Sequence, residues 1–168
     1  TIDFSDPELA AEPITHIKYA KPKKRNIDLY YVGKNIRKAA LEKLLDCLKK
    51  NPDDKIMVAY NSVAGCYDIV QHLVQRLQFE EEKVKILCSV SNKNKLGSYY
   101  AELEDNKLPG QINFVTSAYF TGYDLKERYH LISISSNQKT IHSLSDNRLK
   151  QIAGRCRDEK GLLSESIF

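Results

Sequence analysis

The chain alternates short extended apolar runs with amphipathic helical stripes, and this alternation limits its fold more than any other feature. The runs are rich in Ile, Val, Tyr and Phe, which favour strands. They lie at residues 27–32, 55–60, 84–88, 112–116 and 129–135. The first four begin about 28 residues apart, but the units share no sequence, so the pattern does not indicate a repeat array.

Between these runs the apolar period becomes helical. Stripes span Ile36 to Leu48 and Cys66 to Leu77, and a shorter one spans Leu96 to Leu103. Strands and helices that alternate with short links predict parallel strands joined by right-handed crossovers. We therefore expect a three-layer α/β domain, with a mainly parallel sheet flanked by helices.

Polar residues predict where these helices begin and end. Asn35, Ser62 and Ser91 lie near the expected amino-terminal caps, and Asn51-Pro52 should end the first helix. The third stripe contains Tyr99 and Tyr100. Tyrosines can stack on nucleobases, but at helical spacing this pair is expected to pack in the core.

Length and composition indicate one domain. A chain of 168 residues with 42% apolar content can bury a sizeable core. No run approaches the roughly 18 to 20 apolar residues that span a bilayer, and no signal-peptide pattern opens the chain. Cys47, Cys66, Cys88 and Cys156 form no C-x-x-C pair, so we expect reduced thiols in the cytoplasm, with no disulfide and no zinc site. Because the chain starts at Thr1 and its only methionine is Met57, we expect it to belong to a longer protein.

Ligands of open parallel sheets bind at the carboxyl ends of the strands, which selects the loops 61–65, 89–95 and 116–125. The last loop carries the hydroxyls of Thr116, Ser117 and Thr121. Gly122 would let the backbone approach a ligand, and Asp124 could accept a hydrogen bond from a sugar hydroxyl. This chemistry suits a phosphate or a ribose, and the alternative is a polar loop with a turn glycine.

The stretch "LKQIAGRCRDEKG", residues 149–161, places two arginines at the end of an amphipathic segment. Gly154 can end a helix, and Arg155 would then project a charged fork suited to a transferring γ-phosphoryl group. The alternative is that Arg155 and Arg157 only complement the helix dipole, for about 0.3–1 kcal/mol each. If residues 155–157 are extended, both arginines share a side; if helical, they diverge by about 200°.

Four segments of residues 55–158 resemble, in order and spacing, motifs IV, IVa, V and VI of the second RecA-like lobe of superfamily 2 helicases of the DEAD/DEAH type. They are "KIMVAYNSV", "ILCSVSNKN", "INFVTSAYFTGYDL" and "QIAGRCRD". The resemblance implies a lead-in segment at residues 1–26 and a RecA-like carboxyl-terminal helicase domain at residues 27–168.

The resemblance also implies roles for particular residues. Nucleic acid would lie on Asn61, Ser62, Ser89, Lys93, Lys95 and Thr116. The nucleotide would lie on Gly122 and Asp124, with Gln151, Arg155 and Arg157 facing its triphosphate. The chain departs from the motif VI pattern because Ile152 follows Gln151, and because Arg157 is only two residues after Arg155. Arg155 is therefore the arginine finger that the sequence favours.

The sequence lacks the other half of an ATPase site. No G-x-x-x-x-G-K-[ST] loop is present, and "FEEEK" at residues 79–83 follows a helical stripe rather than a strand. ATP and Mg²⁺ would therefore be held mainly by an amino-terminal RecA-like lobe outside this sequence. The four histidines show no metal-ligand spacing, and no Ser-His-Asp arrangement is visible, so we expect structural roles for them.

The net charge of +4 does not by itself indicate nucleic acid. Two cationic segments indicate nucleic-acid binding, namely "KYAKPKKR" at 18–25 and "NKNK" at 92–95. The first could equally be a solvated connector.

Three functional hypotheses remain open. They are a helicase or translocase lobe, a non-catalytic nucleic-acid-binding module of the same fold, and a small doubly wound nucleotide-binding enzyme. A G-K-[ST] loop encoded upstream would favour the first.

Overall fold

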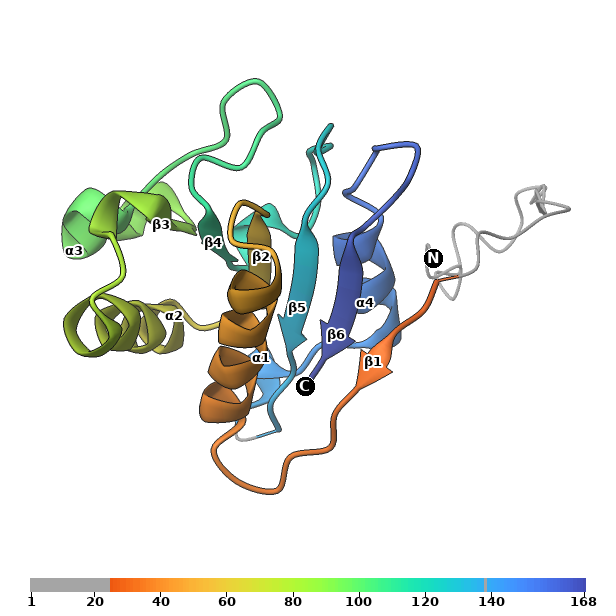
Figure 1. Cartoon of the computed structure of the whole chain (residues 1–168), viewed down its shortest axis with the longest axis horizontal. Coiled ribbons are helices and arrows are strands. Elements are labelled where there is room, and N and C mark those ends of the chain that lie inside the picture. Colours follow the sequence, from red (N-terminus) through yellow and green to blue (C-terminus); the bar gives the residue numbers. More distant parts are fainter. Residues whose placement is uncertain (1–24, 138) are drawn as a thin grey trace, which may run out of the picture.

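The computed structural model describes residues 25–137 and 139–168, and its centre is one six-stranded sheet. The strand order is β1-β6-β5-β2-β4-β3, and every strand pair is parallel. The strands are β1 (Asp28–Leu29), β2 (Ile56–Tyr60), β3 (Val84–Leu87), β4 (Ile112–Val115), β5 (His130–Ile134) and β6 (Ser164–Ile167). Figure 1 shows β3 and β1 at opposite edges of the sheet.

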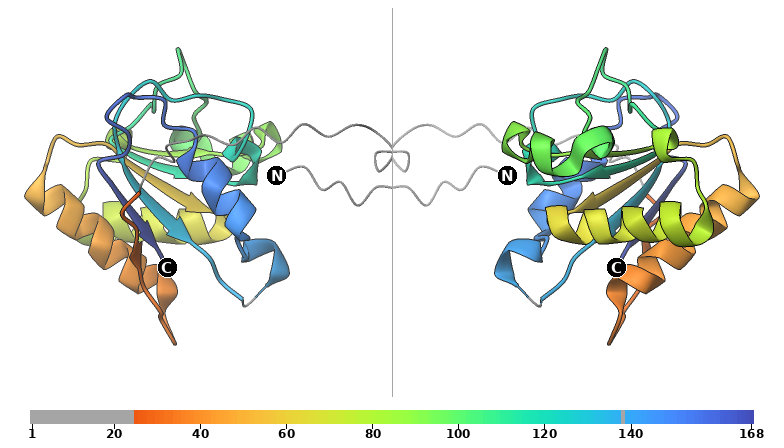
Figure 2. Two further views of the ribbon diagram at one scale, coloured as in Figure 1. Left: turned by 90° about the vertical axis from the view of Figure 1, so that its right-hand side faces the viewer. Right: turned by 90° about the vertical axis from the view of Figure 1, so that its left-hand side faces the viewer.

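Helices cover both faces of this sheet. The α-helices are α1 (Ile36–Lys50), α2 (Val63–Gln71), α3 (Lys93–Leu96) and α4 (Asp146–Ala153). A π-helical segment, η1 (His72–Arg76), continues α2. The short 3₁₀ turns are η2 (Glu81–Lys83), η3 (Val90–Asn92), η4 (Gly97–Tyr99), η5 (Ser117–Tyr119) and η6 (Thr140–His142). Figure 2 shows the sheet edge-on between α1 and α4, so the predicted three-layer α/β architecture with a parallel sheet is confirmed.

The core has two halves, one on each face of the sheet. On strand β2, Ile56 and Val58 belong to the cluster under α1 and α2, whereas Met57 and Ala59 belong to the cluster under α4. All five residues of β2 are buried. A strand buried on both faces reads as a continuous apolar run, which is why the central strands were predictable from the sequence.

The two strands at the β1 edge differ from the prediction. Only Asp28 and Leu29 of the expected strand 27–32 pair in the sheet, and both are exposed. Strand β6 was not predicted, because its sequence "SESI" is polar. Its Glu165 is only 3% exposed, and the guanidinium of Arg25 contacts both carboxylate oxygens at 3.0 Å. The ion pair compensates for burial of the carboxylate, so a polar segment can lie inside the sheet.

The predicted helix ends are confirmed in part. The Oγ of Ser62 accepts a hydrogen bond from the backbone nitrogen of Gly65 at 3.1 Å and caps α2. Asn51 and Gly154 follow the last residues of α1 and α4. Asn35 is different, since it has a left-handed backbone with φ of 58° and its side chain makes no capping bond.

The third stripe forms less helix than predicted. Helix α3 ends at Leu96, and Gly97 turns the chain with φ of 55°. Ser91, an expected cap, instead lies inside the η3 turn. The expected packing of the tyrosines is confirmed, because Tyr99 is buried and Tyr100 packs against the same cluster while half-buried.

Within the described residues, no helix is long and apolar enough to cross a membrane. Cys47, Cys66 and Cys88 are free thiols, and Cys66 is fully buried. Burial raises the pKa of the Cys66 thiol, so this thiol packs as a small apolar group.

Candidate functional site

The predicted ligand residues fall into two groups, because the segment between β4 and β5 crosses the α4 face of the sheet. Thr116 begins this segment at the carboxyl end of β4. By Glu127 the chain has reached the amino end of the sheet, where Glu127 pairs with Lys55 just before β2 at 2.8 Å. The loop rule predicted that Gly122 and Asp124 lie at the carboxyl edge of the sheet. This prediction is wrong, because both residues lie toward the amino end of the sheet.

Asp124 is brought beside the end of α4 by a short parallel bridge. The backbone nitrogen of Leu125 donates to the oxygen of Arg155 at 2.7 Å, and the nitrogen of Arg157 donates to the oxygen of Leu125 at 2.8 Å. Arg155 still lies in the turn that ends α4, Cys156 is paired in the bridge, and the guanidinium groups of Arg155 and Arg157 both lie within 4 Å of Asp124. Both arginines therefore lie on the same side, which is one of the two arrangements considered from the sequence.

An open hollow of about 540 Å³ lies at this point, and we call it the arginine hollow. Its lining combines three cationic side chains with one carboxylate and a glycine. The residues are Asn106, Gly122, Tyr123, Asp124, Lys126, Arg155 and Arg157. Such a hollow can accept an anionic ligand from solvent.

The two arginines are held differently. Arg155 donates from Nη1 to the backbone oxygen of Tyr123 at 2.8 Å and from Nε to the backbone oxygen of Gln151 at 3.1 Å. Its side chain is only 18% exposed. Arg157 donates from Nε to Oδ1 of Asp124 at 2.8 Å and is 53% exposed. Arg155 thus fixes the end of α4 against the Tyr123 segment, whereas Arg157 is held through one exposed carboxylate.

Asp124 is shared between both arginines. Its Oδ1 also lies 3.8 Å from Nη1 of Arg155, and its side chain is 49% exposed. Gly122 has φ of +87°, a conformation that favours glycine, and no other atom lies within 4 Å of the position that a β-carbon would take. The side chain of Gln151 is exposed on α4, and its described contact to Arg155 uses its backbone oxygen.

Tyr123 forms a partly buried wall of the hollow. Desolvation raises the pKa of its phenol, against an opposing effect of Arg155, so the phenol is neutral at physiological pH. Its hydroxyl lies 4.0 Å from the sulfur of Met57. Tyr123 therefore contributes a neutral aromatic ring to the lining of the hollow.

At the carboxyl edge, three of the six predicted nucleic-acid residues are engaged within the domain. Asn61 accepts from the backbone nitrogen of Ser117 at 3.1 Å and donates to the oxygen of Ile141 at 2.6 Å. Ser62 caps α2, and Thr116 is only 5% exposed. The side chains of Asn61 and Ser62 therefore stabilise this edge through hydrogen bonds, and Thr116 is buried within it.

The other three predicted residues present their side chains to solvent. Ser89 shares a hydrogen bond with Ser91 at 3.1 Å, and both are exposed. Lys93 and Lys95 are exposed on α3, and the ammonium of Lys93 lies 5.6 Å from the ring centre of Tyr100. We call Ser89, Lys93 and Lys95 the lysine edge.

Three residues of the arginine hollow, Asn106, Tyr123 and Lys126, were not predicted as site residues from the sequence. Asp105 and Asn106 both have left-handed backbones, with φ of 51° and 57°, in the turn that carries Asn106. The oxygen of Asn106 accepts from the nitrogen of Lys126 at 3.3 Å. The Asp-Asn pair is a turn signal, but only tertiary packing shows that the turn reaches the hollow.

No Ser-His-Asp arrangement is visible in the sequence, yet the fold creates one. Nδ1 of His130 lies 2.8 Å from Oγ of Ser164, and its Nε2 lies 3.1 Å from Oδ2 of Asp54. His130 is 8% exposed, and the three residues begin or precede three neighbouring strands. Both ring nitrogens are used, so His130 joins the amino ends of these strands.

Of the predicted lead-in cations, Lys18, Lys21, Lys23 and Lys24 lie outside the described residues. Arg25 is described, and it pairs with Glu165. No group of three or more His, Cys, Asp or Glu side chains that could hold a metal ion occurs in the described part of the chain.

No family model matches the sequence, and no curated protein matches it. Among solved structures, the chain is similar to the helicase domain of Hef from Pyrococcus furiosus, with 19% identity and a TM-score of 0.47. The alignment covers 79% of this chain and 24% of that chain. The chain thus spans about a quarter of the length of that protein chain. The fold assignment rests on the strand order and the parallel pairings described above.

Proposed function

We propose that this chain is the carboxyl-terminal RecA-like lobe of an ATP-dependent nucleic-acid helicase or translocase of superfamily 2. The observation that carries the proposal is the arginine hollow, where two arginines from the end of α4 meet Asp124 from the segment after β4. Two of the four helicase-like segments, those that resemble motifs V and VI, contribute the two halves of this contact. An amino-terminal lobe of a longer protein would supply the phosphate loop that this sequence lacks.

The chemistry of the hollow suits the transfer of a γ-phosphoryl group. Negative charge shifts within the phosphate chain in the transition state, and a guanidinium fork stabilises it through paired hydrogen bonds. The exposed Arg157 is the arginine finger in this proposal, because releasing it breaks one solvent-exposed ion pair. Arg155 is a positioning residue, since moving it would break its bonds to the oxygens of Tyr123 and Gln151. This order reverses the preference from the sequence.

Asp124 has two proposed functions in this site. It neutralises Arg157 when no anion is bound, and its carboxylate can accept from a ribose hydroxyl once Arg157 turns to the phosphates. Gly122 leaves the backbone open to a nucleotide. Mg²⁺, which would neutralise phosphate charge, is assigned to the other lobe, because Asp124 is the only carboxylate in the described lining.

Nucleic acid is assigned to the lysine edge. Two exposed lysines and a hydroxyl can contact phosphates regardless of sequence, and such contacts weaken as salt rises. The engaged side chains of Asn61, Ser62 and Thr116 would shape this surface rather than contact phosphate. The cytoplasmic location stays a prediction.

The test is oligonucleotide binding by the 168-residue chain. With two to three phosphate contacts, affinity should fall roughly tenfold between 50 and 200 mM salt. The double variant Lys93→Ala/Lys95→Ala should bind more weakly and show a shallower salt dependence. The matched control is Lys49→Ala/Lys50→Ala at the end of α1, which removes the same charge from another surface. Equal losses in both double variants, or a salt-insensitive affinity, would contradict the assignment.

A further inference from the structure

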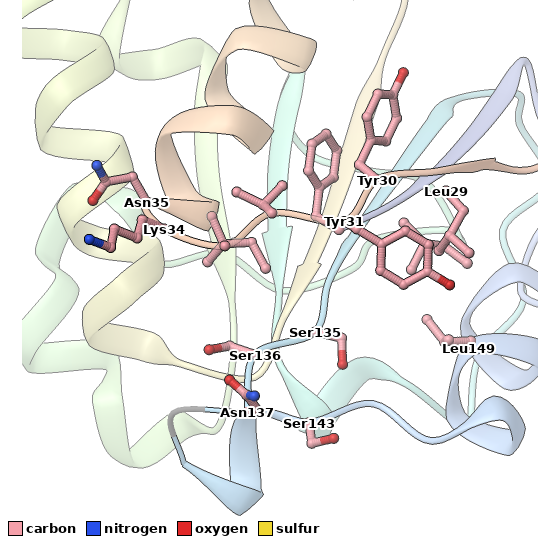
Figure 3. Close-up of a pocket in the computed structure, with 15 residues that line it drawn as sticks. Leu29, Tyr30, Tyr31, Lys34, Asn35, Ser135, Ser136, Asn137, Ser143 and Leu149 are labelled. Atoms are coloured by element: carbon pink, nitrogen blue, oxygen red, sulfur yellow. The ribbon is translucent and has the colours of Figure 1, made fainter.

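A second hollow, of about 390 Å³, lies where the ends of β1 and β6 meet the loop after β5. Figure 3 shows Leu29 and Tyr31 on one wall, Leu149 of α4 facing them, and Ser135 and Ser143 below. We call it the tyrosine hollow. None of the helicase-like motifs assigns a ligand to it.

Tyr31 is the most exposed large side chain of this hollow. It is 91% exposed, although it directly follows a residue whose backbone is fixed in the sheet. The nitrogen of Tyr30 donates to the oxygen of Ile167 at 2.8 Å, and the Tyr30 ring stacks on Phe168 with centroids 4.6 Å apart. Tyr31 is thus an exposed aromatic ring that directly follows an anchored residue, which limits the entropy lost when a ligand stacks on it.

The remaining lining combines apolar walls with neutral polar groups. Ser135 is oriented, because its Oγ accepts from the nitrogen of Leu144 at 3.0 Å. Asn35, Asn137 and Ser143 add amide and hydroxyl groups. Lys34 is the only charged side chain in the described lining, which contains no Asp or Glu. Aromatic faces beside amides and hydroxyls suit a nucleobase better than an apolar helix or a lipid chain.

The tyrosine hollow and the residues of the lysine edge both lie at the carboxyl ends of the strands. Strands β1, β5 and β6 end at the hollow, and β3 leads into the lysine edge. Because all strands are parallel, these ends face the same way. Five inter-strand spacings of about 4.8 Å separate β3 from β1, which is roughly 24 Å. A single strand of nucleic acid bound at the lysines can extend along this edge to Tyr31.

We propose that Tyr31 is a stacking platform for a base of single-stranded nucleic acid, with the amides and hydroxyls of the tyrosine hollow contacting the base edge. This inference rests on the proposed nucleic-acid-binding function. It adds a base contact to the phosphate contacts at the lysine edge. Stacking of this kind tolerates any sequence, because every base has an aromatic face.

The experiment compares two 15-nucleotide probes, an oligothymidylate and an abasic strand of the same length, by fluorescence anisotropy with the 168-residue chain. Tyr31→Ala should weaken oligothymidylate binding roughly fivefold or more, while abasic binding stays within twofold. Tyr31→Phe should retain the affinity, because it keeps the ring. Tyr67→Ala, at an exposed tyrosine on α2, is the control and should bind as the wild type does.

The outcomes separate this inference from the proposed function. If Tyr31→Ala binds oligothymidylate normally while Lys93→Ala/Lys95→Ala does not, the stacking platform is wrong and the lysine edge stands. If Tyr31→Ala loses both probes equally, Tyr31 does not act through a base. If the wild type binds neither probe, both proposals fail. Thermal melting of each variant checks folding, and an exposed Tyr31 should leave the melting temperature unchanged.

Discussion

The Nε of Arg157 donates to Oδ1 of Asp124 at 2.8 Å, across 33 residues of sequence. This contact joins the segment after β4 to the end of α4. In the proposed function it keeps the arginine hollow partly neutral until an anion competes for the guanidinium. Asp124 then competes with the phosphate chain of the nucleotide for the guanidinium of Arg157.

Asp124→Asn should therefore increase the affinity of the 168-residue chain for inorganic tripolyphosphate, by about threefold to tenfold. The amide keeps the shape of the side chain and removes the competing charge. Titration calorimetry measures the change. Asp46→Asn is the control, because Asp46 also forms an ion pair, with Lys50, but lies on α1. A lower affinity for Asp124→Asn would show that the carboxylate supports anion binding instead of opposing it.

Sequence patterns were sufficient for the interior of this fold, because β2, β4 and β5 are buried along their whole length and mostly apolar. Strand β6 could not be found in the same way. Glu165 depends on Arg25, and Ser164 on His130, and both partners are distant in sequence. Because these stabilising partners are distant in sequence, the polar strand has no local sequence pattern that predicts it.

The sequence indicated part of the lining of the arginine hollow but not the contacts among its residues. The motifs indicated Asp124, Arg155 and Arg157, and the structure brings all three together. The sequence could not show that Arg155 bonds to the backbone of Tyr123, because that contact depends on the bridge between Leu125 and Cys156. In the proposed function, this tertiary contact makes Arg157 rather than Arg155 the arginine finger.

The two arginines should differ in their effect on stability. Arg155→Ala removes hydrogen bonds to two backbone oxygens at a largely buried position, and should lower the free energy of unfolding by about 1–3 kcal/mol. Arg157→Ala removes an exposed ion pair, and should cost about 0–1 kcal/mol. Urea denaturation of both variants measures the difference. The reverse order would mean that Arg157 is the structural member of the pair.

His130 should stabilise the amino ends of the strands. His130→Ala leaves Asp54 and Ser164 without this partner, and we expect a loss of about 1–3 kcal/mol in the free energy of unfolding. The matched control is His72→Ala, at an exposed position in η1, which should change it by less than about 0.5 kcal/mol. If the two variants unfold at the same urea concentration, the His130 contacts contribute nothing measurable.

Glu165 should give the fold a specific pH dependence. Burial raises the pKa of its carboxyl above the ordinary value of 4.5, and Arg25 opposes this shift. The folded protein therefore holds the proton more readily than the unfolded chain does. The stabilisation from this group is fully present below pH 4.5 and is lost as the pH rises through the folded-state pKa.

Glu165→Gln removes this titration. The variant should thus gain stability relative to the wild type as the pH rises from about 4 to about 7. Arg25→Ala removes the opposing cation and should make the decline of stability with pH steeper, with a loss of about 1–3 kcal/mol at pH 7. Urea denaturation at each pH gives the comparison. A difference between Glu165→Gln and the wild type that stays constant over this range would contradict a raised pKa for Glu165.

The most direct measurement for the half-site proposal is kcat for ATP hydrolysis by the longer protein proposed to contain this lobe. Arg157→Ala should lower kcat by about 100-fold or more, with KM for ATP within a few fold, because the guanidinium acts mainly in the transition state. Arg157→Lys should not restore kcat, because a point charge cannot form the bidentate contact. The proposal is contradicted if Arg157→Ala leaves kcat unchanged, or if the 168-residue chain alone hydrolyses ATP and loses that activity with the same substitution.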